Sequence, residues 1–448
     1  MARSTGLSAL ASALHDGMET AAGLVAHAIE CADLPAAAGV FTLRLDGEAR
    51  RAAVAADRAR SSGGEAPFLG VPITIKDNIA LRGYPTTAGS RVLAGTMVAA
   101  EDALVVTRLR QAGFIVLGRT NMTEFAFSGL GLNPHYGTPA NPAFTDAVHI
   151  PGGSTSGGAV SVALGIVPAT IGTDTGGSLR IPAAFCGLVG FKPTASAVSS
   201  EGVLPLSGTL DAVGVIASGV ADCRMLFDVI RQDEPQPARA DGGLPRIGVV
   251  SNYVMQGLDP AVHDAFEAGV ARLAAAGARI ERIEIPILDT IPEMMRDGTI
   301  PAAEAFAWHR QHLPGASEAD YDPRVISRIK PGGTITSASY LALLARRREM
   351  IAAFAAAAQG FDALAWPTVP ITAPAIDVFA EDDAYHRLNA LVLRNSTVIN
   401  LADGCAISLP LPTDGAPTGI TLAAAHGRDD ALLATALQVE AIFSSFHP

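Results

Sequence analysis

The sequence has few charged residues and few aromatic residues. Of its 448 residues, 17% are charged and 5% are aromatic, against about 25% charged in a typical globular protein. The net charge is −12, whereas a broad nucleic-acid surface needs clustered lysine and arginine, so we expect no nucleic-acid partner. The 49% share of hydrophobic residues excludes a disordered chain.

Long apolar runs and cysteine pairs are also missing. The best candidate for a membrane span, 147–173, is interrupted by proline, glycine and hydroxyl residues, whereas a span needs about 20 predominantly apolar residues. The first twenty residues have no unbroken apolar core of the secretory kind. We therefore expect no membrane association and a cytoplasmic location. The four cysteines are widely spaced, which is typical of buried reduced thiols.

Helical and extended patterns alternate along the chain. Helical periodicity is evident in 7–31 and 46–61, and the short apolar run 70–75 is typical of a buried strand. The same patterns predict helices at 101–112, 156–165, 219–231 and 259–276, and strands at 114–117, 168–172, 246–251, 279–285 and 361–367. The alternation predicts an α/β fold with a mixed, mostly parallel central sheet covered by helices on both sides.

Three stretches combine glycine with lysine or hydroxyl side chains. They are GVPITIKDN at 70–78, PGGSTSGG at 151–158 and GTDTGGSLRIP at 172–182. From residue 147 to residue 191 the only formal charges are Asp174 and Arg180, where about eleven would be average. Small hydroxyl residues in a buried, permissive backbone are typical of a site where main-chain amides approach a ligand.

Familiar glycine-rich and serine sites do not fit these stretches. PGGSTSGG lacks the Gly-Lys-Ser/Thr ending of a phosphate loop and the G-x-G-x-x-G spacing of a dinucleotide turn. A Ser-His-Asp hydrolase would need a G-x-S-x-G elbow, which the chain does not contain. Nucleotide binding and a histidine-based triad are therefore not favoured.

Together the three stretches resemble the signature of the amidase signature family, the Ser-cis-Ser-Lys amidohydrolases. TTAGS at 86–90, GLNPHYGTPANP at 131–142 and RNSTVINLADGCAISLP at 394–410 follow in the family's order. The likeness covers nearly the whole chain. It is closest to stand-alone bacterial amidases of the carboxybiuret-hydrolase-like and glutamyl-tRNA amidotransferase A-subunit-like branch. One departure is GGSTSG at 152–157, where the family often has GGSSGG.

The resemblance implies a catalytic triad of Lys76, Ser154 and Ser178. In the family the nucleophile follows GTDTGG, the second serine follows PGG and a cis peptide, and the lysine of KDN is the general base. The oxyanion hole would be formed by the amides of the loop that leads to the nucleophile, those of Thr175, Gly176, Gly177 and Ser178.

Lys76 can act as a base only when it is neutral. The ordinary pKa of a lysine is about 10.4, but burial in a charge-poor environment can lower that pKa to near 7. A carboxylate beside the lysine would oppose this. Adjacent strand residues point to opposite faces, so we predict that the Asp77 side chain points away from Lys76.

The residues of the substrate pocket are less clearly marked. Gly153, Phe125 and Tyr136 are candidates for its wall. Arg180 and Asp174 flank the nucleophile loop, where we expect an ion pair that fixes the turn; the alternative is that Arg180 binds a substrate carboxylate. No metal ligand set and no organic cofactor are implied.

The resemblance predicts a single amidase domain over 1–448. Within it we expect an N-terminal helical segment at 1–65, the signature-bearing catalytic core at 66–231 and a helical layer over the core at 286–360. The stretch 232–245 is rich in proline, glycine and aspartate and is the best linker candidate.

The predicted function is an amidohydrolase that cleaves the C–N bond of a small amide, or of a urea- or biuret-like amide, through an acyl-enzyme on Ser178. It would release ammonia or an amine. The alternative is the A-type subunit of a glutamyl-tRNA amidotransferase, which makes ammonia from glutamine; CAISLPLPTDGAPTGITL at 405–422 departs from the GLPxGxQ pattern of such subunits. A binding scaffold without catalysis is disfavoured because all three triad residues are present. A homodimer is expected, and the further option is a complex with a small partner subunit.

Overall fold

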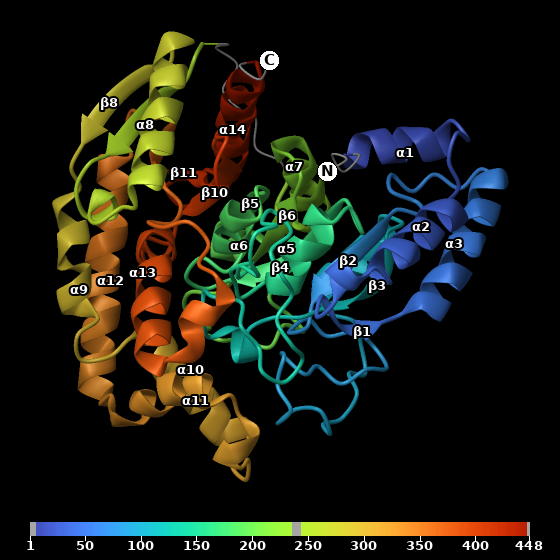
Figure 1. Ribbon diagram of the computed structural model, residues 1–448, viewed down its shortest axis with the longest axis horizontal. Coiled ribbons are helices and arrows are strands. Elements are labelled where there is room, and N and C mark those ends of the chain that lie inside the picture. The colour runs from blue at the N-terminus through green and yellow to red at the C-terminus, as the bar shows by residue number, and fades with distance from the viewer. Residues whose placement is uncertain (1–5, 235–242, 446–448) are drawn as a thin grey trace.

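The computed structural model describes residues 6–234 and 243–445. Most of the linker expected at 232–245 therefore lies outside the described residues. Within them, eleven strands form one sheet, and helices pack on both of its faces (Figure 1). No helix in the described part is long and apolar enough to cross a membrane.

The sheet joins two halves of the chain. Its order is β1-β3-β2-β4-β6-β5-β10-β11-β9-β7-β8. The strands β1 to β11 span Phe41–Arg44, Pro72–Lys76, Ile115–Thr120, Ala169–Asp174, Val189–Lys192, Ala212–Ala217, Arg246–Val250, Arg279–Ile283, Ala363–Pro367, Cys405–Pro410 and Gly419–Ala424. The strands that precede residue 235 fill one half and those that follow residue 242 fill the other, so β5 and β10 meet between them.

The mixed α/β architecture is confirmed, but the parallel share of the sheet is smaller than expected. β2 lies parallel to β3 and β4, and β7 lies parallel to β8 and β9. The other six neighbouring pairs in the described sheet are antiparallel. A buried strand has the same hydrophobic pattern in either direction, so the sequence could not separate the two cases.

Helices account for most of the remaining chain. The helices α1 to α14 span Leu7–His15, Ala21–Ala32, Asp46–Ser61, Leu104–Gln111, Ser156–Ala163, Arg180–Phe185, Val220–Ile230, Pro260–Ala275, Ile291–Met294, Ile300–His312, Pro323–Ile329, Ser337–Ala357, Asp382–Leu401 and Asp429–Ser444. The segment expected to be helical over 1–65 differs in two ways. The pattern at 7–31 divides into α1 and α2 because Thr20 caps α2 by accepting a hydrogen bond from the amide of Gly23. In addition, β1 interrupts the segment and pairs with β3.

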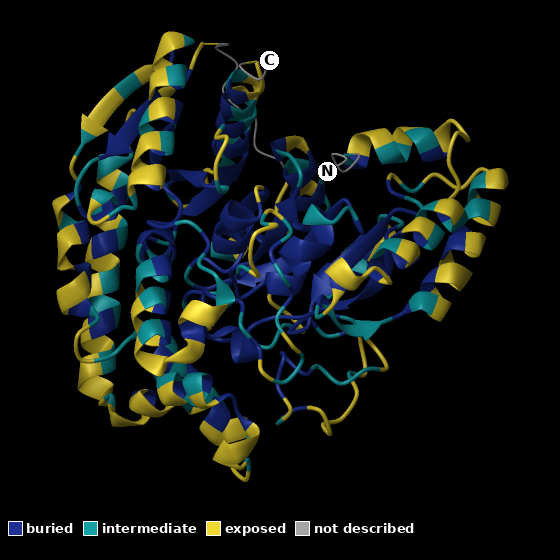
Figure 2. Cartoon of the chain, viewed as in Figure 1, coloured by how far each residue is buried: buried dark blue, intermediate teal, exposed yellow. Residues whose placement is uncertain are grey.

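Alternate residues of the central strands face two separate cores. In β9, Ala363 and Ala365 belong to the core beneath α7, α8 and α14, whereas Leu364 and Trp366 belong to the core beneath α9, α12 and α13. Side chains of a strand alternate between faces, so strands covered on both sides read as continuous apolar runs. Figure 2 shows these strands buried and the outer helix faces exposed.

The region 286–360 contains α9 to α12. α9 and α12 lie beside α13 at one side of the molecule, and α10 and α11 lie below them (Figure 1). Apolar side chains of α10 and α11 pack against the loops near residues 88–93 and 122–127, which follow β2 and β3. These helices therefore border the edge of the sheet where the carboxyl ends of β2, β3 and β4 meet.

Candidate active site

Lys76 is the last residue of β2, and β4 lies beside it in parallel. The carboxyl ends of neighbouring parallel strands share one edge, which places Lys76 next to Thr173 near the end of β4. Hydrogen bonds of 2.8 Å join Nζ of Lys76 to Oγ of Ser154 and to Oγ1 of Thr173. Lys76 is fully buried, so its amine is held by two hydroxyls away from solvent.

The surroundings of Lys76 favour its neutral form. Burial lowers the pKa of Lys76 to about 7, against the opposing attraction of Asp211 and Asp174. The Asp77 carboxylate turns to the other side, as expected: it pairs with Nε of Arg119 at 3.2 Å and accepts the amide of Gly89 at 3.0 Å. Lys76 is therefore suited to accept a proton near neutral pH.

Ser154 lies in the loop that leads into α5. The Gly153–Ser154 peptide bond is cis, as the resemblance implied. The amide of Thr155 donates to the carbonyl of Ser178 at 3.2 Å, so the loop of the second serine is fastened to the loop of the expected nucleophile. A Cβ at Gly157 would lie 2.2 Å from the carbonyl oxygen of Val40, which explains why the first turn of α5 needs glycine.

Asp174 organises the loop that carries Ser178. Its carboxylate accepts the amides of Gly177 at 2.8 Å and Leu179 at 3.2 Å, and it pairs with Nη2 of Arg180 at 2.9 Å. Burial alone would raise the pKa of Asp174, but the Arg180 charge and the hydrogen bonds lower it to about 2. The loop is thus built around a permanent buried carboxylate.

Three of the four amides expected to form the oxyanion hole are free to donate in the structure. Within the described residues, no hydrogen-bond acceptor is found for the amides of Thr175, Gly176 and Ser178, whereas the Gly177 amide donates to Asp174. Gly177 has φ +130°, and a Cβ there would lie 2.1 Å from Oγ of Ser396. Gly177 therefore shapes the turn, and among these four residues the amides of Thr175, Gly176 and Ser178 are the ones left free to donate.

The loop is held from the opposite side by α13. Oγ of Ser396 donates to the carbonyl of Gly176 at 2.6 Å, and Oγ1 of Thr397 reaches the same oxygen at 3.3 Å. The N–H of the same peptide unit belongs to Gly177 and donates to Asp174, so this peptide is fixed from both sides. A loop fixed in this way holds its free amides without reorganising during a reaction.

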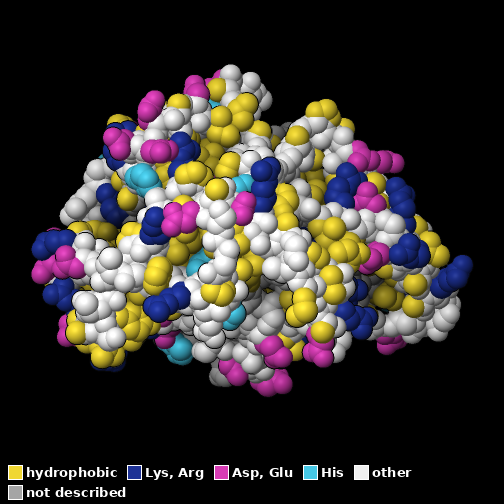
Figure 3. Space-filling model, turned by 90° about the horizontal axis from the view of Figure 1, so that it is seen from below, with side chains coloured by type: hydrophobic (Ala, Val, Ile, Leu, Met, Phe, Trp, Pro, Cys, Tyr) yellow, Lys and Arg dark blue, Asp and Glu magenta, His cyan; other side chains and the backbone are white. Residues whose placement is uncertain are grey.

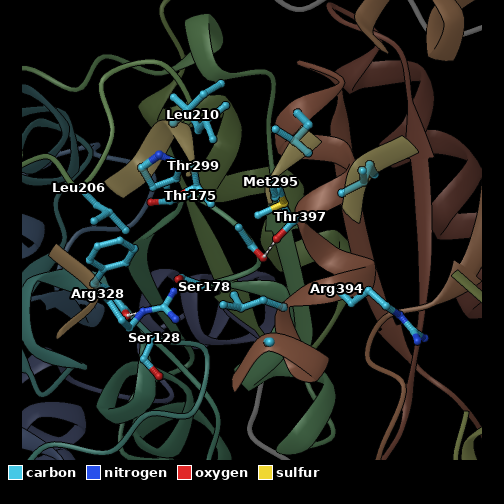
Figure 4. Close-up of a pocket in the computed structure, with 18 of the residues that line it drawn as sticks. Ser128, Thr175, Ser178, Leu206, Leu210, Met295, Thr299, Arg328, Arg394 and Thr397 are labelled. Atoms are coloured by element: carbon cyan, nitrogen blue, oxygen red, sulfur yellow. Dashed lines mark hydrogen bonds between the residues drawn. The ribbon is translucent and has the colours of Figure 1, made fainter. Parts of the chain in front are cut away.

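Ser178, Thr175 and Gly176 open onto a cavity of about 310 Å³ (Figure 4). Apolar side chains from the region of α9 and α10, from α13 and from the loop before β6 form most of its wall: Leu206, Leu210, Ile291, Met294, Met295, Ile300, Leu393 and Leu401. Mostly apolar walls with a few convergent polar groups are typical of a small-molecule site.

Two arginines line this cavity, and they are oriented differently. In Figure 4 the Arg328 guanidinium lies between Ser128 and Ser178, whereas the Arg394 side chain extends away from them. Nε of Arg328 donates to the carbonyl of Phe127 at 2.8 Å. No carboxylate of the described residues forms an ion pair with Arg328, and burial lowers the pKa of Arg328. The guanidinium stacks over the Phe127 ring, 4.7 Å from its centroid, so Arg328 is a cation without a carboxylate partner in the cavity that Ser178 also lines.

The predicted pocket residues fall mainly outside the cavity wall. Phe125 is buried against Trp308, His309 and Tyr321. Gly153 is enclosed, since a Cβ there would lie 2.6 Å from the amide nitrogen of Gly131.

Tyr136 and Arg180 also lie apart from the cavity wall. The amide of Tyr136 donates to Asn133 in an outer loop. Arg180 is fully buried and donates to Asp174, Asn400 and the carbonyl of Ser396. Of the two alternatives for Arg180, the structure supports the ion pair with Asp174, and Arg180 does not line the cavity, so the candidate contact with a substrate is corrected.

Sequence reasoning missed Thr173, Asp211 and Arg328. Thr173 stands inside the GTDTGGS motif, so its hydroxyl could have been singled out beside the lysine. Asp211 and Arg328 lie in no motif recognised from the sequence, and only the fold brings them near residues 76 and 178. In the described part of the chain, no group of three or more His, Cys, Asp or Glu side chains is arranged to hold a metal ion.

A buried lysine bonded to a serine, a second serine with free loop amides and an apolar cavity are together the components of a hydrolase site. The family model described as Amidase matches residues 33–433. The chain belongs to this family, so the resemblance to the amidase signature proteins is confirmed. It is a hydrolase that acts on carbon–nitrogen bonds of amides.

Known proteins of several kinds are similar to the chain. A 2-amino-5-chloromuconic acid deaminase from Comamonas testosteroni is 35% identical, covering 89% of this chain and 87% of that protein. The A-type subunit of the glutamyl-tRNA(Gln) amidotransferase from Symbiobacterium thermophilum is 35% identical, covering 87% and 86%. A solved structure described as a crystal structure of amidase is 31% identical with a TM-score of 0.89, covering 98% of this chain and 100% of that one.

Proposed function

We propose that the protein hydrolyses a small amide through an acyl-enzyme on Ser178. The observation that carries this proposal is the 2.8 Å hydrogen bond between Lys76 and Ser154, made in a fully buried site beside the loop of Ser178. A serine hydroxyl is a weak nucleophile at neutral pH and needs an adjacent base. Neutral Lys76 supplies that base, with Ser154 as the relay.

The reaction proceeds in two stages. Lys76 takes the proton of Ser154 while Ser154 takes that of Ser178, and Oγ of Ser178 attacks the amide carbon. The amides of Thr175, Gly176 and Ser178 stabilise the tetrahedral oxyanion. The C–N bond then breaks, the leaving nitrogen receives a proton through Ser154, and ammonia or an amine departs. Water, activated by the same relay, hydrolyses the ester and restores Ser178.

The cavity favours an amide with an apolar body and an anionic group. The apolar walls accommodate the body, and the unpaired guanidinium of Arg328 lies where a carboxylate could reach it beside Ser178. Arginine is the side chain best shaped for bidentate carboxylate binding. One relative is itself named for an acid, 2-amino-5-chloromuconic acid. The test is to measure ammonia release from paired amides that differ only in carrying a carboxylate or its neutral ester.

Replacement of Arg328 by methionine is expected to raise KM for carboxylate-bearing amides about 10- to 100-fold, because a hydrogen bond to a charged group contributes roughly 1.5–3 kcal/mol. KM for the neutral partner should change little. Arg394→Met is the matched control, since Arg394 lines the same cavity but extends away from Ser178. Equal losses on both substrates in Arg328→Met would refute an anionic substrate.

A second candidate function is that of the A-type component of a glutamyl-tRNA amidotransferase, which the similarity to such proteins supports. Figure 3 shows basic and acidic side chains interspersed on the face seen from below. Purification from the native host distinguishes the two functions: a stand-alone amidase hydrolyses amides without ATP or tRNA. Co-purification of a larger partner protein with tRNA-dependent activity would favour the amidotransferase. The homodimer and the cytoplasmic location stay predictions.

A further inference from the structure

Asp211 lies just outside the proposed reaction path, at the start of β6. β6 pairs antiparallel with β4, and Ala212 stands opposite Asp174. This register brings Asp211 beside Thr175, the first residue after β4. Oγ1 of Thr175 donates to Oδ1 of Asp211. Thr175 is the first residue of the loop 175–178, here called the oxyanion loop, so the Asp211 carboxylate holds the beginning of this loop.

The second oxygen of Asp211 holds a wall of the cavity. Oδ2 accepts the amides of Leu206 at 2.9 Å and Ser207 at 3.1 Å. Leu206 and Leu210 line the cavity together with Thr175, and Figure 4 shows all three on one side of it. One carboxylate thus fastens the oxyanion loop to the 206–210 loop.

Glu304 on α10 holds the same 206–210 loop from the other side. It accepts the amide of Thr209 at 3.1 Å, the hydroxyls of Ser207 and Thr209, and the hydroxyl of Tyr340 at 2.6 Å. Two carboxylates therefore fix one loop, but only Asp211 also reaches the oxyanion loop. Glu304 provides a natural comparison for Asp211.

The charge of Asp211 is not compensated by an arginine. Of the carboxylates near Lys76, Asp174 pairs with Arg180 and Asp77 pairs with Arg119. No ion pair of Asp211 with a basic side chain is found within the described residues. Asp211 and Asp174 are the carboxylates that attract the Lys76 ammonium, and Lys76 in turn attracts Asp211. Burial raises the pKa of Asp211 to about 6, so the carboxyl is ionised above that pH.

We propose that Asp211 is a positioning residue of the amidase reaction, which fixes Thr175 in the loop of residues 175–178 and supplies a negative charge near Lys76 that no basic side chain of the described residues pairs with. The proposal rests on the proposed function of Lys76 and Ser178. It assigns different roles to Asp174 and Asp211. Asp174 is paired with Arg180 and shapes the loop that carries Ser178, whereas Asp211 binds Thr175 and the 206–210 loop without an arginine partner in the described residues.

Asp211→Asn is the test. The amide side chain can still accept from Leu206 and Ser207 and donate to Thr175, so the hydrogen bonds are replaced while the charge is removed. The acidic limb of the kcat/KM profile should move to lower pH by about half a unit, because loss of a nearby negative charge makes Lys76 release its proton more readily. Plateau kcat should fall about 5- to 30-fold, since neutral hydrogen bonds hold Thr175 less firmly than charged ones.

Glu304→Gln is the matched control, because it loosens the same loop without removing the charge of Asp211. It should change KM and leave the acidic limb in place. Thr175→Val removes only the hydroxyl and should lower kcat at constant KM, and it keeps the proposal testable if Asp211→Asn does not fold. Three results would each overturn the proposal. The acidic limb of the kcat/KM profile could stay in place in folded Asp211→Asn, it could move by the same amount in Glu304→Gln, or kcat could be unchanged in Thr175→Val. Failure of the proposed function is distinct, since the wild-type protein would then hydrolyse no amide through Ser178.

Discussion

Replacement of Ser178 by alanine is expected to abolish amide hydrolysis, lowering kcat by a factor on the order of 10³–10⁶. Ser178 is the hydroxyl that faces the cavity from a loop with three free amides, so its loss removes the atom that forms the acyl-enzyme. The measurement is ammonia release from the preferred amide, together with a thermal melt to show that the variant is folded.

Ser156→Ala is the matched control for this substitution. Ser156 is a buried serine at the first position of α5, and its Oγ donates to the carbonyl of Asn121 at 3.3 Å rather than to Lys76. It should retain activity within a few-fold of the wild type. Full activity in folded Ser178→Ala would show that another residue is the nucleophile.

The rate of hydrolysis is expected to rise with pH through about 7. Burial lowers the pKa of Lys76 to about 7, and only the neutral amine can accept the proton of Ser154. The ammonium form predominates below that pH, so kcat/KM should fall about tenfold per pH unit on the acidic side. Lys76→Met should remove this limb and lower the plateau rate by about 10²–10⁴.

Lys192 offers a matched control, because it is also fully buried but donates to the carbonyl of Pro193. Folded Lys192→Met should keep the acidic limb of the wild type. A pH profile that is flat between 5 and 8 in the wild type, or that keeps its acidic limb in Lys76→Met, would contradict the role of Lys76 as the base.

The sequence predicted local elements well where the apolar pattern was short and bounded. The run at 70–75 became β2, Pro72–Lys76, with the lysine at its end. Strand direction was not accessible, because β10 and β11 form an antiparallel pair and β2 and β4 a parallel one with the same apolar character. Whether two strands pair parallel or antiparallel depends on their connections and on which strands become neighbours. The periodicity of a single strand carries no information on either.

The triad was predicted from motifs, whereas the surroundings of the triad were not. Lys76 and Thr173 are separated by 97 residues, and Arg328 reaches the cavity from α11, whose sequence has no pattern that marks a binding residue. Arg180 is the converse case: it is two residues from the nucleophile in sequence, yet its guanidinium is buried in the ion pair with Asp174 and does not line the cavity. Sequence proximity identified the loop, and the fold decided which cation faces the cavity.

The most direct test of the account is to label the protein with a fluorophosphonate, which phosphonylates an activated serine hydroxyl and releases fluoride. Peptide mass analysis should find one phosphonyl group per chain, on Ser178, with labelling slowed at least tenfold in Lys76→Met because the base is gone. Labelling of Ser154 instead of Ser178, or equally fast labelling in Lys76→Met, would contradict a nucleophilic Ser178 activated by a buried lysine.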